Sequence, residues 1–217
     1  MRPSKNLPLF SEEVCSQNPA PFFYEGLACS DGYDMIAGVD EAGRGPLAGP
    51  VVAAAVIIPK GIYLDGIQDS KKMTAKAREK AFSVIHSQCQ SVGLGVVSHK
   101  YIDEFDILKA SLEAMRRAVL SLNKPVEYLL VDGIHPVPLP IPQRCIIKGD
   151  QLSRSISAAS VFAKVYRDRI MYSYHNIYPE YGFDRNKGYG TRRHFEAIKQ
   201  YGASPIHRLS FKGVCRM

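Results

Sequence analysis

Two adjacent carboxylates and a glycine-arginine-glycine turn stand together early in the sequence. Asp40 and Glu41 close the apolar run that begins at Ile36, and Gly43-Arg44-Gly45 follows at once. Neighbouring negative charges at the edge of a core repel each other unless a cation joins them. Glycines let a ligand approach the backbone, successive N–H groups in such a turn can bind an anion, and the arginine fork suits phosphate. A cation site beside a phosphate site indicates metal-assisted phosphodiester chemistry.

Two further acids follow apolar runs in the same way. Asp132 ends the run from Tyr128, and Asp150 ends the run from Cys145, each next to a glycine. Ligands of α/β sheets collect at the carboxyl ends of the strands, so the four acids are expected to converge from three strands and hold hard cations through oxygen. Adjacent strand residues point to opposite faces. Asp40 and Glu41 are therefore expected to share a cation only if the strand bends or ends between them.

The same residues fit a plainer interpretation, a surface turn in which Asp40 and Glu41 are solvated. For an acid pair alone, that interpretation is the commoner one. The combination of a strand, an acid pair and a Gly-Arg-Gly turn is much rarer by chance, which favours the metal site.

The apolar spacing predicts the elements that carry these groups. Runs bounded by glycine or proline predict strands at 36–41, 51–58, 92–97, 128–131 and 144–147. Helical spacing predicts helices at 74–90, at 102–122 with a break near Asp106, at 153–175 and at 191–201. An antiparallel meander of the first three strands joined to two parallel strands gives an α/β protein with a mixed five-stranded sheet flanked by helices.

The composition indicates a globular protein with a basic surface. Lys and Arg exceed Asp and Glu by 28 to 21, for a net charge of +7, and such a surface favours polyanions because phosphate neutralisation releases counterions. The longest apolar run, Val51 to Ile58, is too short to span a bilayer, and no secretory signal is recognised. Five scattered cysteines without a Cys-x-x-Cys pair argue against disulfides or zinc and fit a reducing cytoplasm.

Ordered motifs over most of the chain resemble the prokaryotic type 2 ribonucleases H, the ribonuclease HII family. The matching stretches are Gly38-Val39-Asp40-Glu41-Ala42-Gly43-Arg44-Gly45-Pro46, Asp69-Ser70-Lys71-Lys72, Asp132-Gly133, Lys148-Gly149-Asp150, Ile156-Ser157-Ala158-Ala159-Ser160, Ala163-Lys164-Val165, Lys187-Gly188-Tyr189 and His207-Arg208. One departure is Ile134, which stands where relatives usually have asparagine. The resemblance implies an RNase H-like fold and dependence on one or two Mg²⁺ or Mn²⁺ ions. It also implies hydrolysis on the 5′ side of ribonucleotides in RNA–DNA hybrids or in ribonucleotide-containing duplex DNA, leaving a 3′-hydroxyl and a 5′-phosphate.

The resemblance further implies roles for individual residues. The implied metal-binding catalytic acids are Asp40, Glu41, Asp132 and Asp150. Gly43-Arg44-Gly45 would read the ribose 2′-hydroxyl, and Tyr189 would pack against the deoxynucleotide sugar beside the ribonucleotide. The remaining expected substrate-binding residues are Lys71, Lys72, Ser157 and Lys164.

Competing functions remain open at this stage. A binding module without catalysis would need one strand-end acid replaced, and all four are present. An RNase H-like DNA nuclease or recombinase would use the same acids, but the Gly-Arg-Gly turn and Tyr189 argue against it, and a two-carboxylate glycosidase leaves the basic charge unexplained. We expect a monomeric, cytoplasmic endoribonuclease without a membrane segment. Residues 1–34 would form an irregular extension too short for its own core, and residues 35–217 an RNase H-like catalytic domain.

Overall fold

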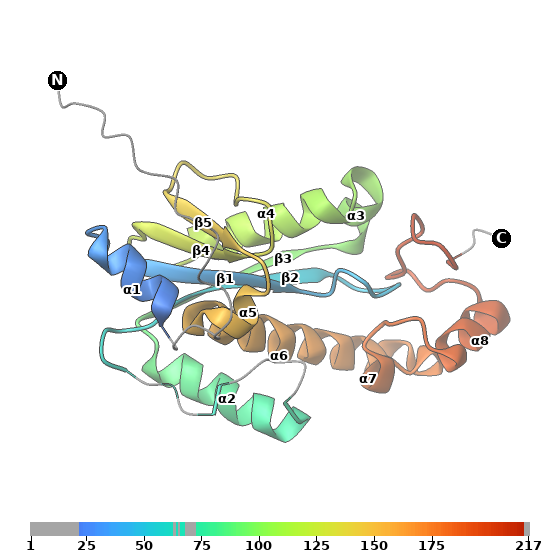
Figure 1. Cartoon of the computed structure of the whole chain (residues 1–217). Helices are drawn as coiled ribbons and strands as arrows, with labels where there is room; N and C mark the ends of the chain where they lie inside the picture. The colour runs from blue at the N-terminus through green and yellow to red at the C-terminus, as the bar shows by residue number, and fades with distance from the viewer. Residues whose placement is uncertain (1–21, 63, 65, 68–72, 215–217) are drawn as a thin grey trace.

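A five-stranded sheet forms the centre of the molecule (Figure 1) in the computed structural model, which describes residues 22–62, 64, 66–67 and 73–214. The strands are β1 (Ile36–Ala42), β2 (Val51–Ile57), β3 (Ser91–Val97), β4 (Tyr128–Asp132) and β5 (Gln143–Ile146), in the spatial order β3-β2-β1-β4-β5. β2 pairs antiparallel with β1 and β3, whereas β4 pairs parallel with β1 and β5. The predicted antiparallel meander joined to a parallel half is therefore confirmed.

Helices cover both faces of this sheet. They are α1 (Phe23–Ser30), α2 (Ala75–Gln88), α3 (His99–Phe105), α4 (Ile107–Leu120), α5 (Gly149–Leu152), α6 (Arg154–Ile177), the 3₁₀ turn η1 (Pro179–Tyr181), α7 (Phe183–Asn186) and α8 (Arg192–Tyr201). α6 packs on β1 and β2 on one face, with α2 outside it, and α4 packs on β1, β2 and β3 on the other (Figure 1). The predicted break at Asp106 is confirmed, since this residue has a φ of 94° between α3 and α4. No helix in the described part of the chain combines the length and apolarity needed to cross a membrane.

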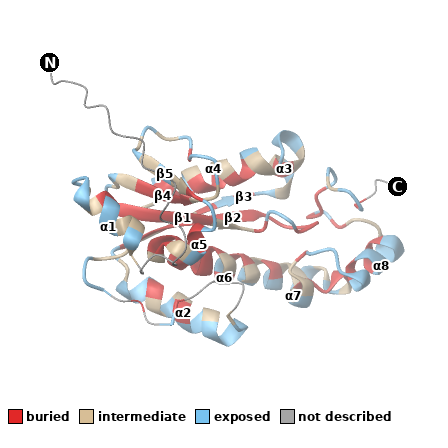
Figure 2. Cartoon of the chain, viewed as in Figure 1, coloured by how far each residue is buried: buried red, intermediate tan, exposed pale blue. Residues whose placement is uncertain are grey.

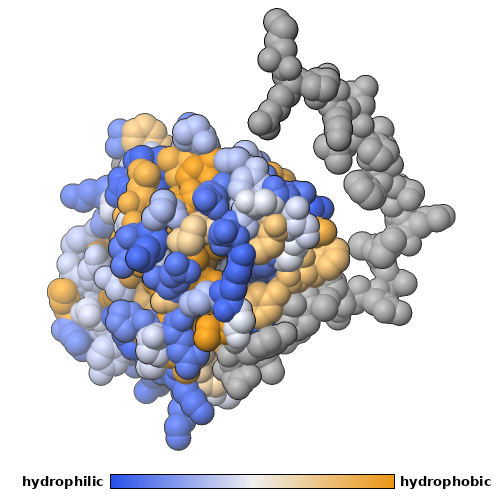
Figure 3. Space-filling view, turned by 90° about the vertical axis from the view of Figure 1, so that its left-hand side faces the viewer, coloured by the Kyte–Doolittle hydropathy of each residue, from blue (hydrophilic) through white to orange (hydrophobic). Residues whose placement is uncertain are grey.

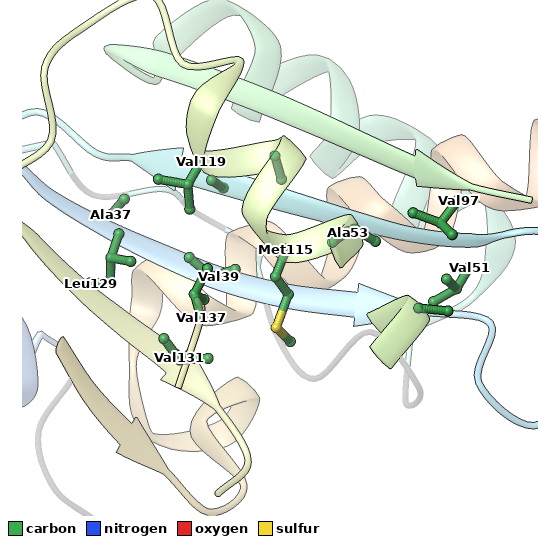
Figure 4. Close-up of a cluster of buried hydrophobic side chains, with 14 of the residues drawn as sticks. Ala37, Val39, Val51, Ala53, Val97, Met115, Val119, Leu129, Val131 and Val137 are labelled. Carbon is green, nitrogen blue, oxygen red and sulfur yellow. The ribbon is translucent and has the colours of Figure 1, made fainter. Parts of the chain in front are cut away.

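The largest buried cluster fills the space between the sheet and α4 (Figure 4). Ala37 and Val39 of β1 and Leu129 and Val131 of β4 point into it, as the alternation of side chains along a strand requires. Met115 of α4 closes the cluster from above the sheet. Figure 2 shows the buried positions continuing along the strands and the sheet-facing side of α6. The rigid centre of the fold therefore includes the strands that end in the acids.

The close approach of α6 to β1 depends on Gly38. A Cβ at this position would lie 2.1 Å from the carbonyl carbon of Ser155 and 2.2 Å from the backbone nitrogen of Ile156. No larger residue fits without moving the helix away from the strand. Because Gly38 and Asp40 lie on the same face of β1, this contact also brings the next turns of α6 against Asp40.

Part of the expected N-terminal extension is ordered, which corrects the sequence interpretation for residues 23–30. These residues form α1, and Glu25 reaches the first turn of α6. Its Oε1 accepts hydrogen bonds from Ser153 Oγ at 2.7 Å, Ser155 N at 2.8 Å and Ser155 Oγ at 2.7 Å. Figure 3 shows this end of the molecule, where hydrophilic and hydrophobic side chains are interspersed. The domain boundary between residues 34 and 35 stays a prediction.

Candidate active site

Three carboxylates meet at the carboxyl ends of β1 and β4. The parallel register pairs Val39 with Val131, so Asp40 and Asp132 each follow a paired residue on adjacent strands. Glu41 comes next along β1, and all three acids line one cavity of about 250 Å³. The predicted convergence of strand-end acids is therefore found for these three residues.

Asp40 and Glu41 enter this cavity from opposite faces of the sheet. Asp40 accepts a hydrogen bond from Ser160 of α6, whereas Glu41 also lines a hollow with Ser111 and Met115 of α4. β1 continues through both acids to Ala42, so the strand does not end between them, and their sharing of a cation stays a prediction. The two carboxylates share the cavity because it lies at the end of the strand, where both faces are accessible.

Burial and mutual repulsion disfavour the charged forms of these acids. Burial raises the pKa of Asp40 well above its usual value, and the negative charges of Glu41 and Asp132 raise it further. The Ser160 hydroxyl and the Glu41 N–H, which lies 2.7 Å from Asp40 Oδ1, oppose this shift only in part. Burial also raises the pKa of Glu41, against the lowering effect of Arg44, whose Nη1 lies 3.3 Å from Glu41 Oε1. The charged forms of Asp40 and Glu41 are therefore costly unless a cation joins them.

A hard cation bound by the carboxylate oxygens would offset this cost. Mg²⁺ typically keeps several waters and is held by one or two carboxylates together with substrate phosphates, not by an all-protein cage. The described residues contain no group of three or more His, Cys, Asp or Glu side chains that could by itself hold a metal ion. Asp40, Glu41 and Asp132 supply oxygen ligands of the required kind on the wall of an accessible cavity.

Asp150 reaches this region by a different route from the one predicted. β5 ends at Ile146, and Asp150 lies buried in the short helix α5. It is not among the residues that line the cavity of the other three acids. The preceding residue, Gly149, donates its N–H to Asp132 Oδ1 at 2.7 Å. The expectation of a strand-end position is thus wrong, while the metal-binding role of Asp150 stays a prediction.

The Gly-Arg-Gly turn and Tyr189 line the same cavity as the three acids. Gly43 has a φ of 101°, and a Cβ there would lie 2.0 Å from Nε of Arg167, so both the turn and its packing require glycine. A Cβ at Gly45 would lie 3.5 Å from Cε1 of Tyr189, which places the ring over this glycine. Tyr189 is 46% exposed, so its ring faces solvent at the edge of the site.

The remaining predicted substrate contacts have separate outcomes. Lys164 lines the cavity, and its Nζ donates to Asp168 Oδ1 at 2.7 Å. The serine that contacts Asp40 is Ser160, whereas the predicted Ser157 is buried one turn earlier in α6. Lys71 and Lys72 lie outside the described residues. The roles of Ser157 and Lys164 in binding substrate stay predictions.

Two buried arginines that the sequence analysis did not select hold the wall formed by the turn and Tyr189. Arg208 donates through Nη2 to Gly43 O at 2.6 Å and through Nη1 to Arg44 O at 2.9 Å, with further bonds to the carbonyls of Gly49 and Pro50. Arg167 donates to the carbonyls of Pro50, Lys187 and Ala48 at 3.0, 3.0 and 3.2 Å. Burial lowers the pKa of Arg167 to about 10 and that of Arg208 to about 9. Their backbone partners carry no side-chain signature, so nothing local in the sequence reveals the contacts.

Comparison with known proteins relates this site to a family of nucleases. Residues 37–214 match the family model described as Ribonuclease HII. The chain belongs to the ribonuclease HII family. A ribonuclease HII from Geobacter sulfurreducens is 54% identical over 96% of this chain and 95% of that protein. Another from Syntrophotalea carbinolica is 52% identical over 92% of this chain and 95% of that protein. The crystal structure of the ribonuclease H2 from Pyrococcus horikoshii has a TM-score of 0.69 at 30% identity, covering 82% of this chain and 94% of that one.

Membership in the ribonuclease HII family confirms two sequence-based predictions. The RNase H-like fold is confirmed by the strand topology together with the structural likeness. The activity is that of a type 2 ribonuclease H, an endoribonuclease, as the identity to curated ribonucleases HII establishes. The glycosidase and recombinase alternatives are thereby set aside.

Proposed function

We propose that this chain, acting as a monomer, hydrolyses the RNA strand of RNA–DNA hybrids and cuts on the 5′ side of single ribonucleotides in duplex DNA. The carrying observation is that Asp40, Glu41 and Asp132 share one cavity with Gly43-Arg44-Gly45 and Tyr189. One nucleotide and its neighbour could then contact all three features at once. These are the carboxylates, the backbone N–H groups that would meet the ribose, and the ring that would meet the next sugar.

Two groups of residues that line the cavity have different roles. The backbone of Gly43-Arg44-Gly45, held by Arg208, reads the 2′-hydroxyl, the group that distinguishes RNA from DNA. Tyr189 lies over Gly45 and packs its ring on the deoxynucleotide sugar that follows the ribonucleotide. The basic surface of the chain, at +7 overall, favours the polyanionic duplex.

One or two divalent cations, Mg²⁺ or Mn²⁺, would be held by Asp40, Glu41 and Asp132, with Asp150 as a further ligand. Such a cation, when bound, lowers the pKa of an attacking water and offsets charge on the leaving 3′ oxygen. The carboxylates attract the cation because burial and the neighbouring negative charges disfavour their charged forms, and a bound cation would offset that effect. Lys164 lines the same cavity, where its ammonium group would face the substrate phosphate.

The direct test measures cleavage of a DNA duplex that carries one ribonucleotide, with Mg²⁺ or Mn²⁺ and with excess chelator. Cleavage 5′ of the ribonucleotide that chelator abolishes and added metal restores is the expected result. Tight binding of the duplex without cleavage at any metal concentration would identify an inert binding module instead. Cleavage that persists in chelator would contradict the metal site.

The role of Tyr189 is tested with Tyr189→Ala and Tyr189→Phe. Stacking of a ring on a nucleotide is typically worth ~1–3 kcal/mol, a factor of roughly 5 to 150. Tyr189→Ala should lower kcat/KM on the single-ribonucleotide duplex by about that factor, with a smaller change on a uniform RNA–DNA hybrid, where the junction is absent. Tyr189→Phe keeps the ring face and should lose less. An unchanged ratio between the two substrates in Tyr189→Ala would remove the ring from junction recognition.

A further inference from the structure

A chain of three hydrogen bonds runs from the C-terminal segment to the backbone of Tyr189. The N–H of Ser204 lies 2.9 Å and the Ser204 hydroxyl oxygen 2.7 Å from Nδ1 of His207, and Nε2 of His207 lies 3.0 Å from Nε2 of His194. Nδ1 of His194 lies 2.8 Å from the carbonyl oxygen of Tyr189. Both imidazoles are almost fully buried, with 0% of His194 and 1% of His207 exposed. The catalytic site described above uses neither ring.

The first donor fixes the protonation of the whole chain. The backbone N–H of Ser204 can only donate, so Nδ1 of His207 is bare and the His207 proton sits on Nε2. That proton points to Nε2 of His194, which must accept it. His194 therefore carries its own proton on Nδ1 and donates it to the Tyr189 carbonyl. Every polar atom of the pair is satisfied in one arrangement only, with both rings neutral.

The place where this chain ends is the backbone of Tyr189, which stands between Gly188, with a φ of 86°, and Gly190. The N–H of Tyr189 donates to Asn186 O at 2.9 Å, and its carbonyl accepts the N–H of Thr191 at 2.8 Å in addition to the contact with His194. Tyr189 is 46% exposed, so contacts around the side chain alone restrain its direction incompletely. The contact with His194 is the one that ties this residue to the buried histidine pair.

We propose that His194, held in its tautomer by His207, is a positioning residue that orients Tyr189 over Gly45 and thereby sets the preference for a ribonucleotide followed by deoxyribose. This inference rests on the proposed role of Tyr189. It assigns a specificity function to a buried pair that touches neither the substrate nor the reacting atoms. The chemistry at the carboxylates stays the same, because no member of the pair contacts them.

Two amide replacements of His194 separate this role from simple packing. Asparagine places its amide near the position of Nδ1, whereas glutamine places its amide near Nε2. His194→Asn therefore keeps a donor for the Tyr189 carbonyl and loses the His207 contact, while His194→Gln does the reverse. We expect His194→Asn to keep most of the ratio of kcat/KM between the single-ribonucleotide duplex and the uniform hybrid. We expect His194→Gln to lower that ratio by roughly 2- to 10-fold, because the Tyr189 carbonyl keeps the Thr191 N–H but loses its hydrogen bond to the imidazole.

The control is Tyr181→Phe. The Tyr181 hydroxyl donates to Gly202 O at 2.9 Å, and its ring lies 5.0 Å from that of His207, so the substitution removes a hydrogen bond from the same cluster and leaves the chain to Tyr189 intact. Its melting temperature should fall while the substrate ratio stays unchanged. A ratio that follows melting temperature across all three variants would show that His194 acts only through stability and would overturn the proposal.

A double variant tests whether the effect passes through the tyrosine. In a Tyr189→Ala background, His194→Gln should leave the substrate ratio where Tyr189→Ala already put it, because coupled residues are not additive. A further fall of the same size as in the wild-type background would place His194 outside this route. If Tyr189→Ala lowers the ratio and His194→Gln alone does not, the positioning role fails while the proposed function stands. If Tyr189→Ala itself changes nothing, both fail.

The tautomers can be read without any variant. Nitrogen-15 NMR of the histidine rings in the intact protein at neutral pH should show His194 protonated on Nδ1 and His207 protonated on Nε2. A His194 proton on Nε2 would break the chain at its centre and overturn the proposal, whatever the fate of the variants on folding.

Discussion

Two polar clusters are built in opposite ways: one lines the cavity, and the other, apart from Arg167, lies behind the residues that line it. In the carboxylate cluster, Asp40, Glu41 and Asp132 face one another, and burial and repulsion raise the pKa of Asp40 and Glu41. In the arginine–histidine cluster, which consists of Arg167, His194, His207 and Arg208, the guanidinium groups donate to backbone carbonyls and the two rings satisfy each other. The first cluster needs a cation from outside, whereas the second is complete without a ligand. The carboxylate cluster, whose charged forms are disfavoured, is therefore the one expected to react. The arginine–histidine cluster, whose polar groups have partners within the protein, is the one expected to position other residues.

The largest expected effect comes from removing a charge from the carboxylate cluster. Asp40→Asn should lower kcat by about 10² to 10⁴, since the loss of metal charge stabilisation amounts to several kcal/mol. The same change should raise the melting temperature in the absence of metal, because it removes a buried charge that two neighbours repel. About 1 kcal/mol of relief corresponds to roughly 2–4 °C for a chain of this size. Steady-state kinetics and thermal unfolding measure the two effects on one sample.

Adding metal provides a second test of the carboxylate cluster, through the melting temperatures of the wild type and Asp40→Asn. A cation that binds the folded wild type stabilises it by RT ln(1 + [L]/Kd), about 2.7 kcal/mol at 100 times Kd. The melting temperature of the wild type should rise with Mn²⁺ or Mg²⁺, and that of Asp40→Asn should rise less. Equal metal-induced shifts in the two proteins would move the binding site away from Asp40.

The arginine–histidine cluster should show the reverse pattern, a loss of stability when a charge is removed. Arg208→Met removes the guanidinium donor from the carbonyls of Gly43, Arg44 and Gly49, while Pro50 O keeps the hydrogen bond from Arg167. An unsatisfied buried group costs ~1–3 kcal/mol, so the loss should reach at least about 3 kcal/mol, or roughly 10 °C. Urea unfolding gives the value directly.

Arg117→Met is the matched control for that loss. Arg117 donates to Glu113 and to Val96 O, but its side chain is 46% exposed, so water can replace those contacts and the cost should stay within about 1 kcal/mol. Similar losses in the two variants would mean that the carbonyl contacts of Arg208 contribute no more than a surface ion pair.

The two clusters also differ in how far the sequence reveals them. Asp40, Glu41 and Asp132 end apolar runs, so a local pattern locates them and the strand topology brings them together. Asp150 follows such a run too, but β5 stops at Ile146 and a helix begins at Gly149, a break that apolar residues alone do not encode. Arg208 and Gly43 are 165 positions apart and meet through a carbonyl. A bond of that kind depends on the fold and not on the type of the accepting residue.

Acid titration should give opposite slopes for the two clusters. The pKa of Asp40 is raised in the folded protein, so the folded state holds a proton more tightly than the unfolded chain, and this acid alone would make the protein more stable as pH falls. Burial lowers the pKa of His207 to about 4, below the ~6.5 of an unfolded histidine. Its contribution is present above pH ~6.5 and is lost on going down towards pH 4, up to about 3 kcal/mol in total.

Asp40→Asn and His207→Gln separate the contributions of the two groups to the change of stability with pH. Between pH 7 and 5, the stability of Asp40→Asn should fall more steeply than that of the wild type, because the stabilising acid has gone. The stability of His207→Gln should fall less steeply, because no buried ring remains to be protonated there. Urea midpoints at three pH values measure both slopes, and three parallel curves would contradict the assignment of either group.

A third carboxylate, Glu25, supplies the reference case, because one of its oxygens has several built-in donors while its Oε2 is buried without a hydrogen-bond partner among the described residues. Oε1 of Glu25 accepts three hydrogen bonds from Ser153 and Ser155 at the N-terminus of α6, where the helix dipole also favours negative charge. Unlike Asp40, it should therefore stabilise the fold as it stands. Glu25→Ala should cost ~0.5–2 kcal/mol, the usual range for a lost helix cap, and should change kcat/KM by less than about twofold, because α6 also packs along β1 and β2. Glu196→Ala, at an exposed acid paired with Arg192, should stay within about 0.5 kcal/mol. Glu25→Ala could instead raise the melting temperature, as Asp40→Asn is expected to do. In that case burial of a carboxylate would decide the sign of the stability change, and the hydrogen bonds from Ser153 and Ser155 would not.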